Sequence, residues 1–276
     1  DSTCVCEMSW VQVHIVLYPC GEKMKTTLVN FYKFTCVVFF IYIFKERKDS
    51  MCIFCDIANK KLEINIVYED EALLVLNKPP YMSTIPSREH PNASVANFVA
   101  GYFEKQYIAS TVHIVTRLDR DTSGLLCIAK HRHIHHLTGL MQRAGTIHRQ
   151  YEAIVHGHVE KQSIIAPIGR KDTSIIEREV RADGQYAHTD VSVVKHFMID
   201  GKPYSHIRLK LYTGRTHQIR VHMAHIGHPL VGDELYGGSR VLLARQALHC
   251  VQLQLAHPVS GELLVFSSAL PADMQE

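Results

Sequence analysis

A chain of 276 residues is long enough for one large globular domain or two modest ones. Its 46% hydrophobic and 21% charged residues exclude a disordered tail, a collagen-like chain and a polytopic membrane protein. The 30 Lys and Arg against 27 Asp and Glu leave a net charge of +3, which permits a nucleic-acid partner without requiring one.

The first 65 residues differ from the rest and are expected to form a separate N-terminal segment. Residues 34–44, FTCVVFFIYIF, are too few to cross a bilayer as a helix, and their aromatic and β-branched side chains favour a buried strand. Cys52 and Cys55 lack two further ligands at the spacing of a zinc site, so no metal site is predicted.

Only two of the eight cysteines follow this segment. Cys127 and Cys250 lie in apolar runs and are predicted to be buried free thiols. A domain without paired cysteines is typical of a reducing compartment, so a cytoplasmic location is expected.

The main body, residues 66–276, alternates many short strands with few helices. Residues 66–76 predict two strands around the acidic turn 69–71, and a helix over about 95–103 begins near Ser94. Further helices are predicted over 132–142 and 217–226, the second ending at Gly227. Further strands are predicted at 112–116, 124–130, 150–156, 189–195, 206–212, 248–255 and 262–267. This pattern predicts an α+β fold with a mixed, mainly antiparallel sheet.

The first polar cluster is 117–124, RLDRDTSG, which follows an apolar strand. Arg117 and Asp119 are two residues apart on what is predicted to be a strand end, so their side chains are expected to share a face. A loop that leaves a rigid strand is where catalytic groups tend to lie. The alternative is a polar turn whose charges are solvated.

Two further segments carry candidate groups. In 213–222, TGRTHQIRVH, a predicted helix places Gln218 and His222 on one face with Arg220 between them; the alternative is a solvated helix face. In 148–157, HRQYEAIVHG, the ring of Tyr151 either faces a planar ligand or packs in the core.

Together these motifs resemble the RluA-type family of RNA pseudouridine synthases. The resemblance rests on VYEDEALLVLNKPP (67–80), RLDRDTSGLLCIAK (117–130), RQYEAIVHG (149–157) and LYTGRTHQIRVHMAHIGHPLVGDELYGG (211–238), in that order. It implies a central active cleft and an isomerase that converts specific uridines in structured RNA, rRNA or tRNA, to pseudouridine. No cofactor or metal is expected, because uridine and pseudouridine are isomers. No membrane association and no obligate protein partner are expected either.

The resemblance also implies roles for single residues. Asp119 matches the family's essential aspartate, Arg220 the arginine that pairs with it, and Tyr151 the aromatic residue that stacks on the target uracil. The residues expected to contact RNA or substrate are Arg117, Thr122, Arg215, His217 and Gln218. The family pattern usually has His where this chain has Thr116, and commonly Lys where it has Arg149.

Two other functions stay open at this point. One is a catalytically silent RNA-binding protein that uses the same cleft. The other is a histidine-triad nucleotide hydrolase, because 52–71 is similar to the opening of those enzymes and His131, His133 and His135 alternate. That enzyme needs its histidines on a strand, whereas this stretch is predicted to be helical.

Overall fold

The computed structural model describes residues 10–15, 27–32, 64–87 and 91–275. The chain divides into two compact units, Asp1–Cys52 and Ile53–Glu276. In the first unit β1 (Trp10–Ile15) pairs antiparallel with β2 (Thr27–Tyr32). The predictions for 34–44, Cys52 and Cys55 lie outside the described residues. None of the described helices is long and apolar enough to cross a membrane.

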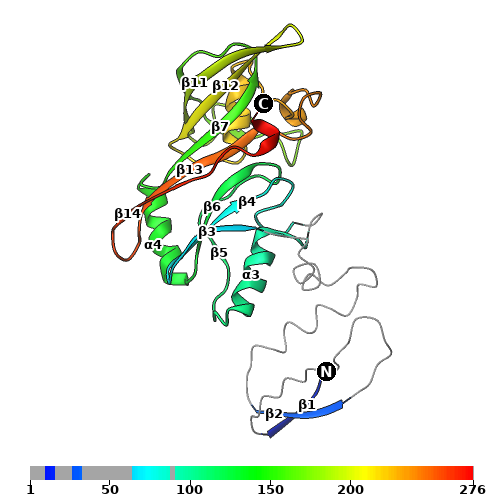
Figure 1. Cartoon of the computed structure of the whole chain (residues 1–276), viewed down its shortest axis with the longest axis vertical. Coiled ribbons are helices and arrows are strands. Elements are labelled where there is room, and N and C mark those ends of the chain that lie inside the picture. Colours follow the sequence, from blue (N-terminus) through cyan, green and yellow to red (C-terminus); the bar gives the residue numbers. More distant parts are fainter. Residues whose placement is uncertain (1–9, 16–26, 33–63, 88–90, 276) are drawn as a thin grey trace. The chain divides into compact units, whose positions relative to one another are not determined.

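The second unit is built on one ten-stranded sheet (Figure 1). The strand order is β3-β4-β6-β13-β7-β12-β11-β8, with β14 paired to β13 and β5 paired to β6. Its strands are β3 (Asn65–Glu69), β4 (Leu73–Lys78), β5 (His113–Ile114), β6 (Ser123–Ala129), β7 (His148–His156), β8 (Gln162–Ile165), β11 (His188–Ile199), β12 (Lys202–Leu211), β13 (Leu248–Ala256) and β14 (Leu263–Ser267). Every pair in it is antiparallel except β13 with β6, which confirms the predicted fold class.

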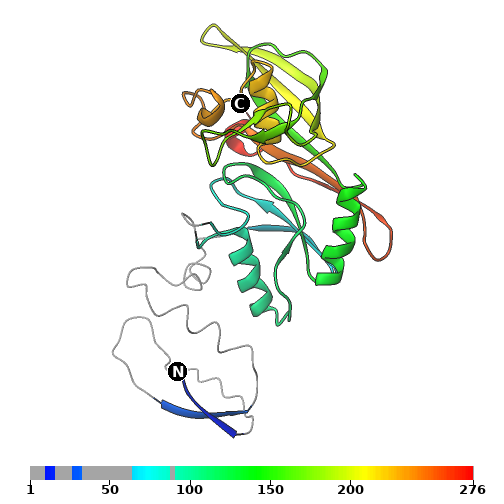
Figure 2. The ribbon, with the colours of Figure 1, turned by 180° about the vertical axis from the view of Figure 1, so that it is seen from behind.

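Strands β13 and β7 connect the two halves of the sheet. In both views they run between the part that holds β3, β4 and β6 and the part that holds β11 and β12 (Figures 1 and 2). The close pairing of β6 with β13 depends on Gly124, which has φ +112° and faces the backbone of Cys250. A side chain at this position would collide with that backbone, so only glycine fits.

The helices are few and short. They are α3 (Val95–Lys105), α4 (Arg132–Arg143) and α5 (Gln218–His225), with 3₁₀ turns η2 (Glu234–Tyr236) and η3 (Ala272–Met274). Ser94 caps α3 in a capping box with Asn97. Six of the eight residues of α5 are buried, so the alternative of a solvated helix face is wrong. It ends before Gly227, which has the left-handed φ expected there.

Most predicted elements are present with boundaries shifted by a few residues. Strand β12 alternates as predicted, with Ile207, Leu209 and Leu211 buried. The acidic turn is made by Asp70, whose side chain accepts hydrogen bonds from the backbone of Ala72 and Leu73. Both Cys127 and Cys250 are buried free thiols, as predicted.

Three short strands of the second unit were not predicted. They are β8, β9 (Ile168–Arg170) and β10 (Arg178–Val180), of which β9 and β10 form a separate two-stranded sheet. Each has four residues or fewer and no long apolar alternation, so the signal that predicts a strand is absent from it.

Candidate active site

The segment that carries Asp119 is a loop between β5 and β6, and the predicted strand end is wrong because β5 stops at Ile114. Two buried side chains from another part of the chain hold the backbone of this loop. The hydroxyl of Thr84 donates to Leu118 O (2.7 Å) and accepts from Leu118 N (3.2 Å). Lys78, which is fully buried, donates to the carbonyl of Arg120 at 2.9 Å. The loop is therefore held by hydrogen bonds between these side chains and its backbone, and not by strand pairing.

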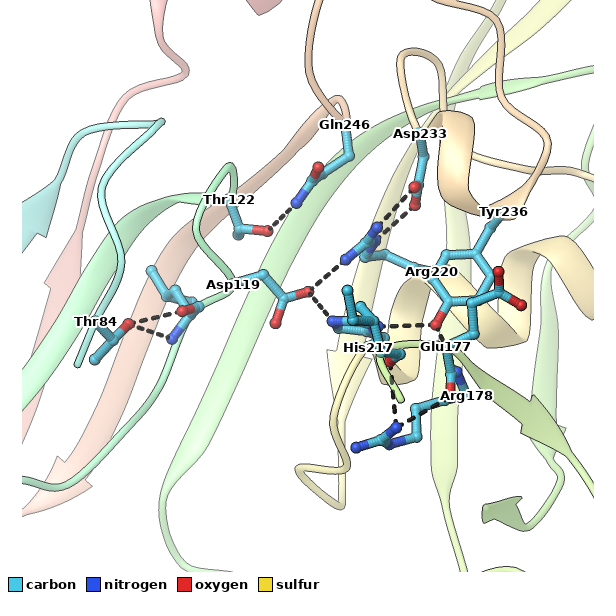
Figure 3. A network of polar contacts seen from close by, with 12 residues as sticks. Thr84, Asp119, Thr122, Glu177, Arg178, His217, Arg220, Asp233, Tyr236 and Gln246 are labelled. Atoms are coloured by element: carbon cyan, nitrogen blue, oxygen red, sulfur yellow. Dashed lines mark hydrogen bonds and ion pairs between the residues drawn. The ribbon is translucent and has the colours of Figure 1, made fainter. Parts of the chain in front are cut away.

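A three-member charge cluster is the centre of the site (Figure 3). Arg220 Nη1 lies 3.1 Å from Asp119 Oδ2, so the predicted ion pair is present. The same guanidinium donates through Nε and Nη2 to Asp233, at 2.7 and 2.8 Å. Burial opposes the charge of Arg220, but the two carboxylates outweigh it and raise its pKa above the ordinary value.

His217 approaches the same carboxylate from the start of α5 (Figure 3). Its Nε2 lies 3.8 Å from Asp119 Oδ2, and its Nδ1 lies 2.8 Å from Tyr236 Oη. The backbone of His217 has φ +57°, a left-handed conformation that costs about 1–3 kcal/mol in a residue other than glycine. This conformation directs the ring toward Asp119.

Asp119 and Arg220 line a cleft of about 1040 Å³ between α4, β7 and residues 211–220. One carboxylate among the described residues lines this cleft, Asp119. Six arginines line it with Asp119: Arg117, Arg132, Arg143, Arg149, Arg215 and Arg220. Asp119 also borders a second hollow of about 490 Å³ on the other side of its loop. A single carboxylate thus stands in a cation-rich groove, which suits a polyanionic ligand.

Comparison with known proteins agrees with this geometry. The family model described as RNA pseudouridylate synthase matches residues 72–225. The Bacillus subtilis protein named uncharacterized RNA pseudouridine synthase YjbO is 48% identical over 217 residues, which cover 77% of this chain and 75% of that protein. The chain belongs to the RNA pseudouridine synthase family.

Two further relatives place the chain within this family. Ribosomal large subunit pseudouridine synthase D of Haemophilus ducreyi is 38% identical over 234 residues, covering 79% of this chain and 70% of that one. The solved structure of human RNA pseudouridylate synthase domain containing 1 has a TM-score of 0.63 and 25% identity, covering 80% of this chain and 86% of that one. The chain is thus an isomerase of the pseudouridine synthase type, and the histidine-triad alternative is wrong because His133 and His135 lie on α4.

The synthase cleft contains Tyr151, which the sequence predicted to stack on uracil. Its ring comes from β7, lines the cleft together with Asp119, and is only 3% exposed. Burial raises the pKa of the Tyr151 phenol, so its hydroxyl stays protonated at neutral pH. The side chain is therefore part of the core and of the cleft floor at once.

The residues predicted to contact RNA differ in their exposure and in the hydrogen bonds that they make within the protein. Arg117 is exposed, lines both hollows and has no hydrogen bond or ion pair with any described residue. Arg215 lines the cleft, and its guanidinium donates hydrogen bonds to the backbone carbonyl of Tyr186 and to the side-chain oxygen of Gln185. Thr122 is 2% exposed and its hydroxyl accepts from Gln246 at 3.2 Å.

The side chain of Gln218 makes all of its hydrogen bonds within the protein. Its carbonyl oxygen accepts from Thr213 and from the backbone of Arg215, and its amide nitrogen donates to His188 and Thr189. Both ends of the buried side chain are therefore used within the protein, and Gln218 holds the turn before α5. Gln218 also lines the cleft, and its contact with substrate stays a prediction.

Several members of this site were not singled out from the sequence. Asp233 and Tyr236 stand in the quoted segment GDELYGG, but nothing in their local spacing connects them to Arg220 or His217. Lys78 and Arg245, which donate to loop carbonyls of Arg120 and Asp121, resemble ordinary surface charges in the sequence. Only tertiary contacts identify these four.

Proposed function

We propose that this synthase converts uridine in structured RNA to pseudouridine with Asp119 as the reacting group, within a catalytic domain of residues 66–276. The observation that best supports this proposal is that the carboxylate of Asp119 lines both hollows. Oδ2 is paired with Arg220, whereas Oδ1 has no hydrogen-bond partner among the described residues. Oδ1 is therefore the oxygen that meets the ribose.

The chemistry needs one ionised carboxylate. The N1–C1′ glycosidic bond breaks, the detached uracil turns, and a C1′–C5 bond forms. The C5–H bond then breaks and its proton leaves to solvent, while N1 takes up a proton, so the product is an isomer of uridine. Asp119 starts this sequence either by attack at C1′ or by removal of a proton at C2′. Both routes use the charged form, and Arg220 supplies a countercharge 3.1 Å from Oδ2.

We assign the base to the floor of the cleft beside Tyr151. Stacking on an aromatic ring contributes roughly 1–3 kcal/mol per base in single-strand binders. That offsets part of the few kcal/mol that extraction of a base from a stack costs. Arg117 stands free at the rim, on the same loop as Asp119, where it can occupy the space that the base vacates.

The partner is RNA, held through its phosphates by the arginine-lined cleft. Cations that line a groove with a single carboxylate bind a polyanion without needing its sequence. The relatives named ribosomal large subunit pseudouridine synthase D favour rRNA over tRNA as the substrate. We therefore propose large-subunit rRNA as the first substrate to test.

The test is tritium release from RNA that carries [5-³H]uridine, prepared from cells that lack this protein. We expect release by the wild type and none by Asp119→Asn, which keeps an acceptor for Arg220 but has no charged oxygen. Matching thermal unfolding curves will show that the variant is folded. Turnover by Asp119→Asn within a few-fold of the wild type would refute the assignment. RNA binding by the wild type without tritium release would instead favour the silent RNA-binding protein.

A further inference from the structure

A chain of polar contacts leads from β10 to Asp119 through Tyr236 and His217. The backbone N–H of Arg178, at the start of β10, donates to Tyr236 Oη at 3.0 Å. Tyr236 Oη lies 2.8 Å from His217 Nδ1, and His217 Nε2 lies 3.8 Å from Asp119 Oδ2 (Figure 3). Neither Arg178 nor Tyr236 was expected to belong to the site.

The direction of these bonds follows from counting hydrogens. A phenol has one hydrogen to donate, and here its oxygen already accepts from Arg178. Its nearest acceptor among the described residues is His217 Nδ1. If Nδ1 carried the hydrogen, Tyr236 Oη would accept twice and its own hydrogen would have no partner in a partly buried place. Nδ1 is therefore the acceptor, and the hydrogen of a neutral His217 lies on Nε2.

We propose that His217 is a positioning residue for Asp119: Tyr236 holds its ring as the neutral Nε2–H tautomer, which donates to Asp119 Oδ2 when RNA is bound. The proposal rests on the proposed function of Asp119. It replaces the RNA contact that the sequence predicted for His217.

The present distance is longer than a hydrogen bond, and the required movement is small. An N–H···O bond needs about 2.7–3.2 Å, so the two groups must approach by roughly 0.6–1 Å. Catalytic hydrogen bonds are often long in ligand-free enzymes and shorten in the substrate complex. Once the hydrogen bond from His217 Nε2 to Asp119 forms, both Arg220 and His217 hold Oδ2, and Oδ1 alone is directed at the ribose.

The surroundings of His217 favour a neutral ring. The charged groups that face it are Asp119 on its loop, Arg220 on α5, Asp233 before η2 and Arg178 on β10. Burial has the largest effect and lowers the pKa of His217, although the two carboxylates oppose it. A neutral donor orients Asp119 without adding a second cation, which would weaken the carboxylate as a nucleophile or base.

The first test observes the tautomer directly. Long-range ¹H–¹⁵N spectra of the full ¹⁵N-labelled chain, with His217 assigned by its loss in His217→Gln, report which ring nitrogen carries hydrogen. We expect an unprotonated Nδ1 and a protonated Nε2 at pH 7.5, and a rise of the His217 pKa in Tyr236→Phe. A hydrogen on Nδ1, or a cationic ring at pH 7.5, would overturn the proposal.

The second test separates positioning from RNA binding. His217→Ala is expected to lower kcat for [5-³H]uridine RNA by about 10- to 100-fold with less than a threefold change in KM. His217→Gln, whose amide reaches a similar position, is expected to recover at least part of that loss. His225→Ala, an exposed histidine on the same helix, serves as the matched control and is expected to behave as wild type. A raised KM with unchanged kcat would show that His217 binds RNA instead.

The two hypotheses fail in different ways. If the wild type releases no tritium from any RNA, the proposed function fails, whatever the spectra show. If the wild type is active and Asp119→Asn is not, but His217→Ala keeps full kcat, the proposed function stands and the role of His217 is refuted.

Discussion

Asp233 holds Arg220 through two parallel hydrogen bonds, 2.7 Å to Nε and 2.8 Å to Nη2. Only Nη1 is left for Asp119, at 3.1 Å. Asp233 is 2% exposed and makes both of its side-chain contacts with a buried guanidinium, so it determines the orientation of a group that it shares with Asp119.

Asp233→Asn should therefore lower activity without touching RNA. An amide can accept only one of the two bonds, so we expect a loss of about 1–3 kcal/mol in the free energy of unfolding. The displaced guanidinium should lower kcat on the order of 10²-fold. Urea denaturation and tritium release measure the two effects. The control is Glu234→Gln, an exposed neighbour whose partner is the exposed Arg240. Wild-type kcat in Asp233→Asn would show that the orientation of Arg220 does not matter.

The aromatic plane of Tyr151 should matter more than its hydroxyl. Tyr151→Phe is expected to keep most of the activity, whereas Tyr151→Ala should lose far more, because stacking needs the ring. Tyr151→Leu retains much of the volume in this buried position and separates loss of stacking from the formation of a cavity. Single-turnover rates, read beside thermal unfolding, check this order. Equal losses in Phe and Leu would argue that the hydroxyl takes part in the chemistry.

The α4 side of the cleft should hold phosphates. Arg132 and Arg143 line the cleft from this helix and have no carboxylate partner among the described residues. The double change to Gln is expected to raise KM for RNA about tenfold, leave kcat unchanged and reduce the slope of log affinity against log salt by about 1.4–1.8. Lys161→Gln with Lys202→Gln, two exposed lysines outside the cleft, is the matched control. An unchanged salt slope would place the RNA elsewhere.

Acid should destabilise the fold through His249, a buried histidine of β13 bonded to Ser123 and Ser268. Burial lowers the pKa of His249 to about 4. Between pH 6.5 and 4 the unfolded chain binds a proton that the folded chain does not, so stability falls as pH falls through this window. We expect the wild type to lose about 2 kcal/mol between pH 7.5 and 5 from this group.

The comparison of urea denaturation at the two pH values tests that expectation. His249→Asn should be less stable at pH 7.5, because its bonds change, but should show a flatter dependence on pH. His133→Asn, an exposed histidine on α4, should retain the wild-type dependence. Identical dependences in wild type and His249→Asn would mean that another group carries the acid response.

Local patterns predicted much of the fold. The alternation in 206–212, the cap at Ser94 and the turn at Asp70 each depend on residues close together in the chain, where pleat and turn chemistry act directly. Short edge strands such as β8 have no such pattern, because their pairing partners supply their order. The strand expected at Arg117 is a loop for a related reason: buried side chains from distant segments hold its backbone.

By itself, the sequence determined the family and predicted Asp119 as the reacting group with Arg220 as its partner, because ordered motifs carry that chemistry in their residue types. Only the tertiary structure decided that Asp233 orients Arg220, that Gln218 supports a turn and that His217 faces Asp119. Asp119 and Arg220 are 101 residues apart, and the register of β7, β12 and β13 brings their segments together. Contacts of that separation depend on how strands pair, which no local spacing encodes.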